Sequence, residues 1–289
     1  NDGNDSLLGD DGNDLIFGGN NFDTISAGEG NDTVYGGNGR DLVYLGEGND
    51  LYIDNAQGGQ LGRDTVFTGL GDDTVEGGNG DDVFYGEDGN DIINGRLGND
   101  LIFGGNNFDT ISAGEGNDTV YGGNGRDLIF LNQGNDLYND NAQGGELGRD
   151  TVFGGFGDDT IEGGNGDDQF FGEDGADVIN ARLGDDTVDG GAGNDTLDGG
   201  GGSDTLTGGA GTDTFVFTAN DAATGTDLVT DFNLGEDVFR LGGTTADAVT
   251  VSYDEALNEA TVLIGDTAVA VLQSVNDLSG FGTDDIAFI

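Results

Sequence analysis

The sequence predicts an all-β protein, a right-handed parallel β-roll in which two sheets of short strands enclose a thin apolar core. Three observations predict this fold. Aspartate recurs every nine residues along most of the 289-residue chain, a glycine-rich turn precedes each of these aspartates, and an apolar residue follows two positions later. Such a unit is long enough for one tight turn and one three-residue strand. Two units therefore make an 18-residue coil with one strand in each sheet.

The aspartate that ends each turn sets the register of the repeat. The series runs from Asp5 to Asp213 in 23 units, at intervals of nine residues except for two intervals of 14, which precede Asp64 and Asp150. The apolar residue two positions after the aspartate is present in every unit and is expected to point inward from the middle of its strand. With strands ~4.8 Å apart, about eleven coils predict a rod roughly 50 Å long.

A longer period overlies the short one. Residues 14–99 recur at 100–185, with both 14-residue intervals and the arginine positions in the same places. We assign residues 1–217 to the roll and residues 218–289 to a β-rich C-terminal cap. The first turn begins in the middle of a unit, so the repeat array is expected to continue upstream.

The composition excludes several functions. The chain has 58 acidic residues against 7 basic ones, and its net charge is −51. Nucleic acids and anionic membrane surfaces require basic patches and are therefore excluded as partners. Without cysteine or histidine there is no disulfide, no ordinary zinc site and no Ser-His-Asp triad. No apolar stretch is long enough for a membrane span. We expect no enzymatic activity in this chain.

With cysteine and histidine absent, the chain can bind a metal only through oxygen atoms of carboxylates, carbonyls and hydroxyls. The pattern of these groups predicts calcium. A turn that directs several carbonyls toward one point needs positive φ angles and therefore glycine. Each turn adds one carboxylate, and the turn stacked beside it supplies a second. Such a cage of carbonyls and two carboxylates suits Ca²⁺ better than Mg²⁺, which retains its waters. The 23 units allow at most 21 such ions, and their +42 charge would offset most of the −51. Without calcium, the chain is expected to be disordered.

The unit matches the consensus G-G-x-G-x-D-x-U-x, with complete copies at residues 77–85 and 190–198. Over residues 1–217 the chain resembles the RTX hemolysin-type calcium-binding proteins, which leave the cell by type I secretion. The resemblance implies a secreted protein with Ca²⁺ as its cofactor and with ions between units n and n+2, for example between Asp168 and Asp186. The predicted metal ligands are Asp14, Asp32, Asp41, Asp50, Asp73, Asp82, Asp91, Asp100, Asp118, Asp127, Asp136, Asp159, Asp168, Asp177, Asp186, Asp195, Asp204 and Asp213.

Some turns depart from the consensus. In the turn before Asp23, Asn21 stands at the fourth position of the consensus, where glycine is expected, and the same change recurs before Asp109. The turns before Asp64 and Asp150 carry five extra residues and are expected to bulge without an ion. Arg96 and Arg182 occupy a glycine position, where their charge could replace that of an ion.

The C-terminal segment predicts alternating strands at 249–253, 260–264 and 268–272 that close the roll. Residues 284–289 place two aspartates before a short apolar terminus. This pattern resembles the uncleaved signal read by type I secretion machinery, and an ordinary final strand is the alternative.

Large aromatic residues lie three positions after several of the repeat aspartates and should point outward. Tyr44, Phe67, Tyr85, Phe103 and Tyr121 should form a ladder on one sheet, and Phe130, Phe153 and Phe171 a shorter ladder on the other. Exposed ladders suggest a face for self-association or for cell-surface polysaccharide. Cross-strand stacking that only stiffens the sheet is the alternative.

The main functional hypothesis is a calcium-folded segment of a secreted surface, matrix or filament-forming protein. The alternative is an accessory module of an exported enzyme such as a protease, lipase or alginate epimerase, or a carbohydrate-binding surface. Catalysis by paired carboxylates is a weaker third possibility, because the acids lie in ligand register.

Overall fold

The computed structural model describes residues 2–54, 62–140, 148–218, 224–243, 249–254, 259–264, 267–273 and 286–288. The chain forms two compact units, Asn1–Glu146 and Leu147–Ile289. The five-residue insertions expected to bulge fall on 55–61 and 141–147, outside the described residues, and so do residues 284 and 285 of the expected secretion signal.

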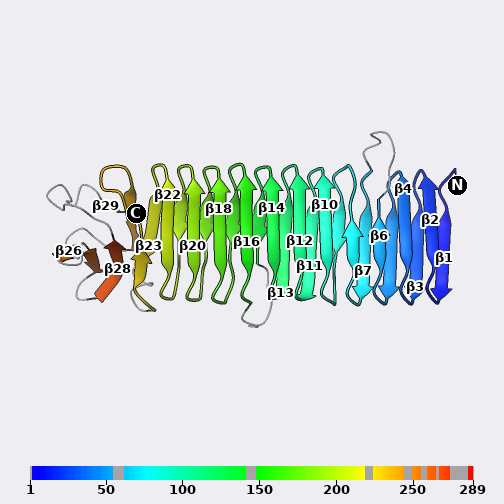
Figure 1. Cartoon of the computed structure of the whole chain (residues 1–289), viewed down its shortest axis with the longest axis horizontal. Helices are drawn as coiled ribbons and strands as arrows, with labels where there is room; N and C mark the ends of the chain where they lie inside the picture. Colours follow the sequence, from blue (N-terminus) through cyan, green and yellow to red (C-terminus); the bar gives the residue numbers. More distant parts are fainter. Residues whose placement is uncertain are drawn as a thin grey trace. The chain divides into compact units, whose positions relative to one another are not determined.

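In the first unit, consecutive strands alternate between two sheets, and every pairing in both sheets is parallel (Figure 1). The first sheet contains β1 (Ser6–Asp11), β3 (Thr24–Glu29), β5 (Leu42–Glu47), β7 (Thr65–Leu70), β9 (Val83–Tyr85), β11 (Leu101–Asn107), β13 (Thr119–Gly125) and β15 (Leu137–Asn139). The second contains β2 (Leu15–Asn20), β4 (Thr33–Asn38), β6 (Leu51–Ile53), β8 (Thr74–Glu76), β10 (Ile92–Leu97), β12 (Thr110–Glu115) and β14 (Leu128–Gln133).

The pairing register is that of an 18-residue coil. Ile93 in β10 lies opposite Ile111 in β12, and Ile102 in β11 lies opposite Val120 in β13. Where the sequence has five extra residues, the register lengthens correspondingly, and Val43 pairs with Val66. The parallel roll predicted from the nine-residue period is therefore confirmed.

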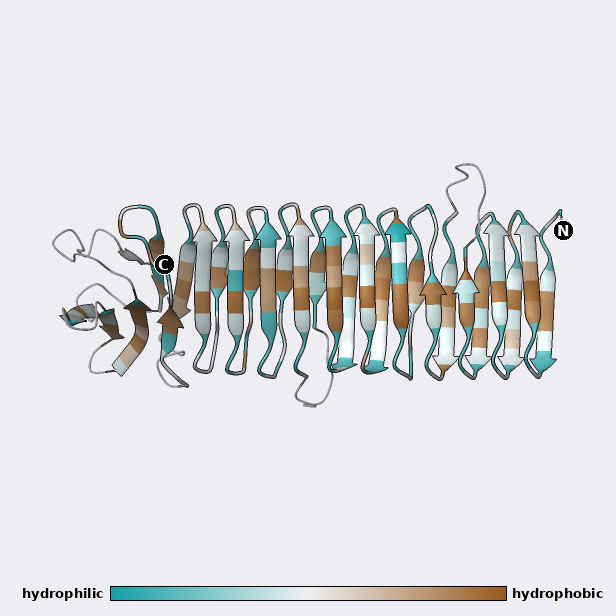
Figure 2. Cartoon of the chain, viewed as in Figure 1, coloured by the Kyte–Doolittle hydropathy of each residue, from teal (hydrophilic) through white to brown (hydrophobic). Residues whose placement is uncertain are grey.

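The core is the row of residues two positions after each repeat aspartate, which Figure 2 shows as a hydrophobic band across the strands. From Ile25 onward these side chains are at most 1% exposed, whereas Leu7 and Ile16 in the first coil are only half-buried. Most strands contribute one large inward side chain, and a few, such as β5 with Val43 and Leu45, contribute two, so the core is thin. Burial of this row is the main apolar contribution to stability.

The second unit continues the same alternation. One sheet contains β17 (Thr160–Glu162), β19 (Val178–Asn180), β21 (Thr196–Asp198), β23 (Thr214–Thr218), β25 (Val238–Gly242) and β29 (Ile286–Phe288). The other contains β16 (Thr151–Phe156), β18 (Gln169–Asp174), β20 (Thr187–Ala192), β22 (Thr205–Ala210), β24 (Asp227–Val229), β28 (Thr267–Gln273), β27 (Glu259–Ile264) and β26 (Val249–Asp254).

The three cap strands predicted after residue 218 are confirmed. β26, β27 and β28 form an antiparallel meander whose last strand pairs in parallel with β24. β29 pairs with β25 and extends the other sheet. The cap thereby covers the last strands of the repeat array, which would otherwise expose unpaired backbone groups. The described residues contain no helix with the length and apolarity that a membrane crossing requires.

Candidate metal centre

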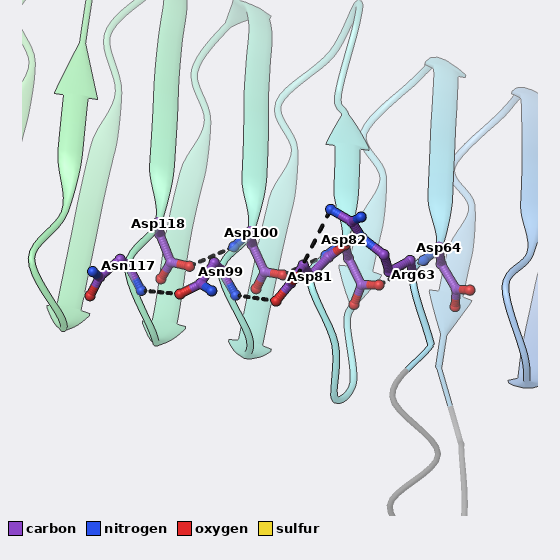
Figure 3. Close-up of polar contacts among 8 residues, drawn as sticks. All are labelled: Arg63, Asp64, Asp81, Asp82, Asn99, Asp100, Asn117 and Asp118. Atoms are coloured by element: carbon purple, nitrogen blue, oxygen red, sulfur yellow. Dashed lines mark hydrogen bonds and ion pairs between the residues drawn. The ribbon is translucent and has the colours of Figure 1, made fainter.

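The repeat aspartates form hydrogen-bonded ladders along the turn edges of each unit. The backbone N–H of Asp82 donates to Oδ1 of Asp100 at 2.8 Å, and that of Asp100 donates to Oδ1 of Asp118 at 2.7 Å (Figure 3). The same contact recurs between the turns of successive coils, and it does so in both compact units. We refer to these rows as the aspartate ladders.

Each unit has two aspartate ladders, one for each edge of the roll. In the first unit they comprise Asp5, Asp23, Asp41, Asp64, Asp82, Asp100, Asp118 and Asp136 on one edge, and Asp14, Asp32, Asp50, Asp73, Asp91, Asp109 and Asp127 on the other. In the second they comprise Asp159, Asp177, Asp195, Asp213 and Asp237, and Asp150, Asp168, Asp186, Asp204 and Asp227.

All eighteen predicted ligands lie in these ladders, and so do five repeat aspartates left out of the prediction: Asp5, Asp23, Asp64, Asp109 and Asp150. Asn21 and Asn107, which replace a turn glycine before Asp23 and Asp109, adopt positive φ angles of 80° and 79°. The turn geometry is therefore kept at both substitutions, as asparagine's tolerance of this region allows.

Glycine in the turn is required by close stacking as well as by its φ angle. Gly80 has a φ of +140°, and a Cβ built there would lie 1.8 Å from the carbonyl oxygen of Gly62 in the neighbouring coil. This approach brings the backbones of successive turns together. It thereby fixes the spacing of the aspartates that follow them.

One carboxylate oxygen of most ladder aspartates is buried and accepts no hydrogen bond. Asp100 illustrates the pattern: it is 2% exposed, its Oδ1 accepts the Asp82 N–H, and its Oδ2 has no hydrogen-bond partner. A buried anionic oxygen without a donor costs several kcal/mol unless a cation compensates it. The other Oδ2 atoms in this situation include those of Asp5, Asp14, Asp23, Asp32, Asp41, Asp50, Asp73, Asp82, Asp91, Asp118, Asp177, Asp186 and Asp195.

Burial also alters the acidity of the ladders. Desolvation is the largest cause and neighbouring carboxylates add to it, so that the pKa of Asp82, Asp91 and Asp186 is raised to about 8. The same causes raise the pKa of Asp41 and Asp100 to about 7. Near neutral pH, protons partly neutralise the ladders, and a divalent cation would compete with these protons.

The surroundings of Oδ2 fit a calcium ion. A Cβ built on Gly95 would lie 2.5 Å from Oδ2 of Asp100 and 2.4 Å from the carbonyl oxygen of Ala113 in the next coil. Carboxylate and carbonyl oxygens thus border the same space, and the first glycine of the turn leaves it open. Among the described residues, no point gathers three or more acidic side chains. Any ion here would therefore take most of its ligands from the backbone, as Ca²⁺ does in flexible oxygen cages.

The prediction that arginine replaces an ion's charge in two turns is wrong. The guanidinium of Arg96 binds Oε2 of Glu76 through Nε at 3.0 Å and Nη2 at 2.7 Å, and Arg182 binds Glu162 in the same way. Both glutamates follow a repeat aspartate by three positions and lie on the outer sheet surface. The long arginine side chain leaves the turn, and Oδ2 of Asp100 remains without a partner.

Two ladder members were missed in the sequence. Asp227 accepts the Asp204 N–H and Asp237 accepts the Asp213 N–H, each at 3.0 Å, so the cap supplies the last aspartate of both ladders. A signal existed for Asp227: it follows Asp213 by 14 residues, the interval that occurs twice earlier. Asp237 breaks the spacing, and only the structure reveals its role.

A second, outer ladder runs beside the first, formed by Asn and Asp residues that precede many of the repeat aspartates. The N–H groups of Asn99 and Asn117 donate to Oδ1 of Asp81 and Asn99, at 3.1 Å and 2.7 Å (Figure 3). At the end of this row, Arg63 donates from Nε to the Asp81 carbonyl at 3.1 Å. The outer ladder satisfies turn N–H groups with side-chain oxygens and stiffens the edge.

The first aromatic ladder is confirmed as a continuous stack. Rings of Tyr44, Phe67, Tyr85, Phe103 and Tyr121 lie 4.6–5.1 Å apart with nearly parallel planes. In the other predicted ladder, Phe153 stacks on Phe171 at 4.9 Å. A further pair, Phe17 and Tyr35, stacks in the first unit. Because each ring covers its neighbour, interior rungs present ring edges to solvent.

The fold and these ladders define a class of protein: a parallel β-roll with rows of buried carboxylates along its edges. The family model "RTX calcium-binding nonapeptide repeat" matches residues 1–25, 17–52, 58–93, 67–102, 103–138, 139–179 and 181–215. The chain therefore belongs to the RTX calcium-binding repeat family, and it is an RTX calcium-binding module. The predicted calcium cofactor agrees with this membership.

Three solved structures are similar to parts of this chain. The extracellular lipase LipA from Serratia marcescens is 20% identical, with a TM-score of 0.34; the alignment covers 83% of this chain and 45% of the lipase. The AlgE6R2 subunit of the Azotobacter vinelandii mannuronan C5-epimerase is 25% identical (TM-score 0.24), over 42% of this chain and 88% of that subunit. The AlgE6R3 subunit is 21% identical (TM-score 0.27), over 56% and 80%. No curated protein matches the chain.

Proposed function

We propose that this chain is a calcium-dependent folding module of a secreted bacterial protein, disordered before export and folded outside the cell. The observation that carries the proposal is the row of buried Oδ2 atoms without hydrogen-bond donors along both edges. These carboxylates make the ion-free roll unfavourable. A cation that binds only the folded form therefore shifts the equilibrium toward folding.

Three kinds of groups in the turns contribute to the proposed calcium sites. The turn glycines allow close stacking, the ladder aspartates supply carboxylates, and the carbonyls of the first turn position border the same space. Calcium, when bound, would supply the positive charge that these oxygens lack. Sites built mainly from backbone carbonyls and few carboxylates are expected to be weak enough to remain empty in the cytosol and to fill at extracellular calcium concentrations.

The module is proposed to serve either a surface, matrix or filament-forming protein or an exported enzyme to which it is attached. In both settings the chain itself is proposed not to catalyse, because its buried acids are committed to the ladders. Binding of polysaccharide by the aromatic ladder is the less favoured proposal. Sugar rings stack on exposed aromatic faces, and here the faces of the interior rungs cover one another.

Calcium stoichiometry tests the proposal. Native mass spectrometry of the purified chain with Ca²⁺, and separately with Mg²⁺ at equal concentration, should show many bound calcium ions and few or no magnesium ions. Binding of both metals to a chain that stays disordered would contradict it. Light scattering of the calcium-loaded chain distinguishes the two settings: growth of particles favours the matrix or filament, and a stable monomer favours the attached module.

A further inference from the structure

Tyr52 breaks the regular pattern at one turn of the aspartate ladder. In regular turns, such as that of Gly95, a Cβ built on the glycine would lie nearest to two groups. These are the carboxylate of the same turn and a backbone carbonyl of the next coil. At Gly36 the nearest atom is Tyr52 Oη at 2.6 Å, followed by Asp41 Oδ2 at 3.2 Å. No carbonyl is among the three nearest atoms there. A phenol oxygen occupies the space that the carbonyl borders elsewhere.

The hydroxyl of Tyr52 also provides what the ladder otherwise lacks. It donates a hydrogen bond to Oδ2 of Asp64 at 2.6 Å, and the tyrosine is completely buried. Asp64 is therefore absent from the aspartates whose Oδ2 has no partner, whereas its ladder neighbours Asp41 and Asp82 are among them. A neutral donor here performs locally the task that a cation performs in regular turns.

The same arrangement recurs one long repeat later. Tyr138 is completely buried, and its Oη lies 2.8 Å from a Cβ built on Gly122, with Asp127 Oδ2 at 3.0 Å from that Cβ. Because the long repeat contains nine units, an odd number, Asp127 belongs to the opposite ladder from Asp41 and Asp64. Elsewhere the inward position carries Val, Ile, Leu or Phe, which have no hydroxyl.

We propose that the hydroxyl of Tyr52 takes the place of a calcium ion between Asp41 and Asp64, and that the hydroxyl of Tyr138 does so beside Asp127. This inference rests on the proposed calcium function. It means that each edge of the first unit carries an interrupted row of ions rather than a continuous one. In the sequence, Tyr52 and Tyr138 each directly precede one of the two five-residue insertions.

The test counts bound ions by native mass spectrometry of the full chain at saturating Ca²⁺. Asp64→Asn should leave the calcium count unchanged, while Asp100→Asn, in a regular turn of the same ladder, should lose at least one ion. Tyr52→Phe keeps the ring and removes the hydroxyl, and should not lower the count: it should stay unchanged, or rise by one where an ion enters the vacated space. Phe84→Tyr is the converse variant: its ring lies 3.0 Å from a Cβ built on Gly77, so it adds a hydroxyl beside that turn and should lose one ion.

Loss of an ion in Asp64→Asn or in Tyr52→Phe would overturn the inference, since either result would place calcium at Asp64 or make the phenol a ligand. Each of these two variants changes only one polar group. If Asp64→Asn does not fold, the calcium count of Tyr52→Phe still tests the inference. A wild-type chain that binds no calcium would instead refute the proposed function itself.

Discussion

Replacing one ladder carboxylate should change stability in opposite directions with and without calcium. Asp100 is the most suitable position, because its Oδ1 accepts the Asp82 N–H at 2.8 Å and its Oδ2 is buried without a donor. Asp100→Asn preserves the shape and the Oδ1 acceptor but removes the charge. Only the interaction of Oδ2 with its surroundings is altered.

The magnitude follows from the pKa of this carboxyl. Burial raises it from 3.8 to about 7. A carboxyl with a raised folded-state pKa favours folding at low pH, and this contribution is lost as pH rises through that value. At pH 7.5 the ionised group therefore opposes folding of the ion-free roll by at most about 4 kcal/mol, at 1.36 kcal/mol per pKa unit. Asp100→Asn removes this penalty and should stabilise the ion-free roll.

With calcium bound, the sign reverses. The variant loses a charged ligand and leaves a buried ion undercoordinated, which should cost about 2–3 kcal/mol. Asp81→Asn is the matched control, because it changes the net charge equally in the adjacent turn but at a half-exposed side chain. It should alter stability by no more than about 0.5 kcal/mol.

Two titrations measure these effects. Urea unfolding in saturating calcium gives the loss in Asp100→Asn, and folding by an excluded osmolyte in chelator gives the gain. If Asp100→Asn behaved like Asp81→Asn in calcium, Oδ2 would not be a cation ligand. If it destabilised the ion-free chain as well, the reasoning on buried charge would be refuted.

Four further predictions follow from the same geometry. In chelator, β-structure measured by circular dichroism should increase as pH falls from about 8 to about 5, because ladder carboxyls with a pKa raised to about 6–8 take up protons in the folded state; a decrease would contradict this. Gly80→Ala should lower stability in calcium by more than about 2 kcal/mol in urea unfolding, while Asn79→Ala should not, because only the former places a Cβ against the Gly62 carbonyl. Arg96→Gln should cost at most about 1 kcal/mol, since its ion pair with Glu76 is exposed; a larger loss would mean that the arginine supports the turn. Phe103→Ser should lower the free energy of unfolding in urea by about 1–3 kcal/mol without changing the oligomeric state in light scattering, and the opposite pattern would identify the aromatic ladder as an association face.

Much of the fold could be predicted because the repeat fixes it locally. The nine-residue spacing of aspartate, glycine and one apolar residue specifies a turn, a strand and an inward side chain, and stacking identical units leaves little choice of register. The eighteen predicted ligands share one sequence position, so they also share one structural environment.

The features that could not be predicted from the sequence depend on which partners individual side chains reach in the folded structure. Arg96 follows the turn in sequence, but its length allows it to reach Glu76 on the sheet surface, which spacing alone does not show. Tyr52 matches the apolar inward position, yet its hydroxyl reaches Oδ2 of Asp64, a contact that the repeat spacing does not reveal. Asp237 enters its ladder at an irregular interval, so only the folded cap reveals it.

The most direct test of calcium-dependent folding is far-ultraviolet circular dichroism of the full chain at pH 7.5, first in excess chelator and then during calcium titration, with magnesium as the control. The buried carboxylates predict a disordered spectrum in chelator and in magnesium, and a cooperative gain of β-structure with calcium. A β-rich spectrum that persists in chelator would contradict the conclusion that cations are a condition of the fold.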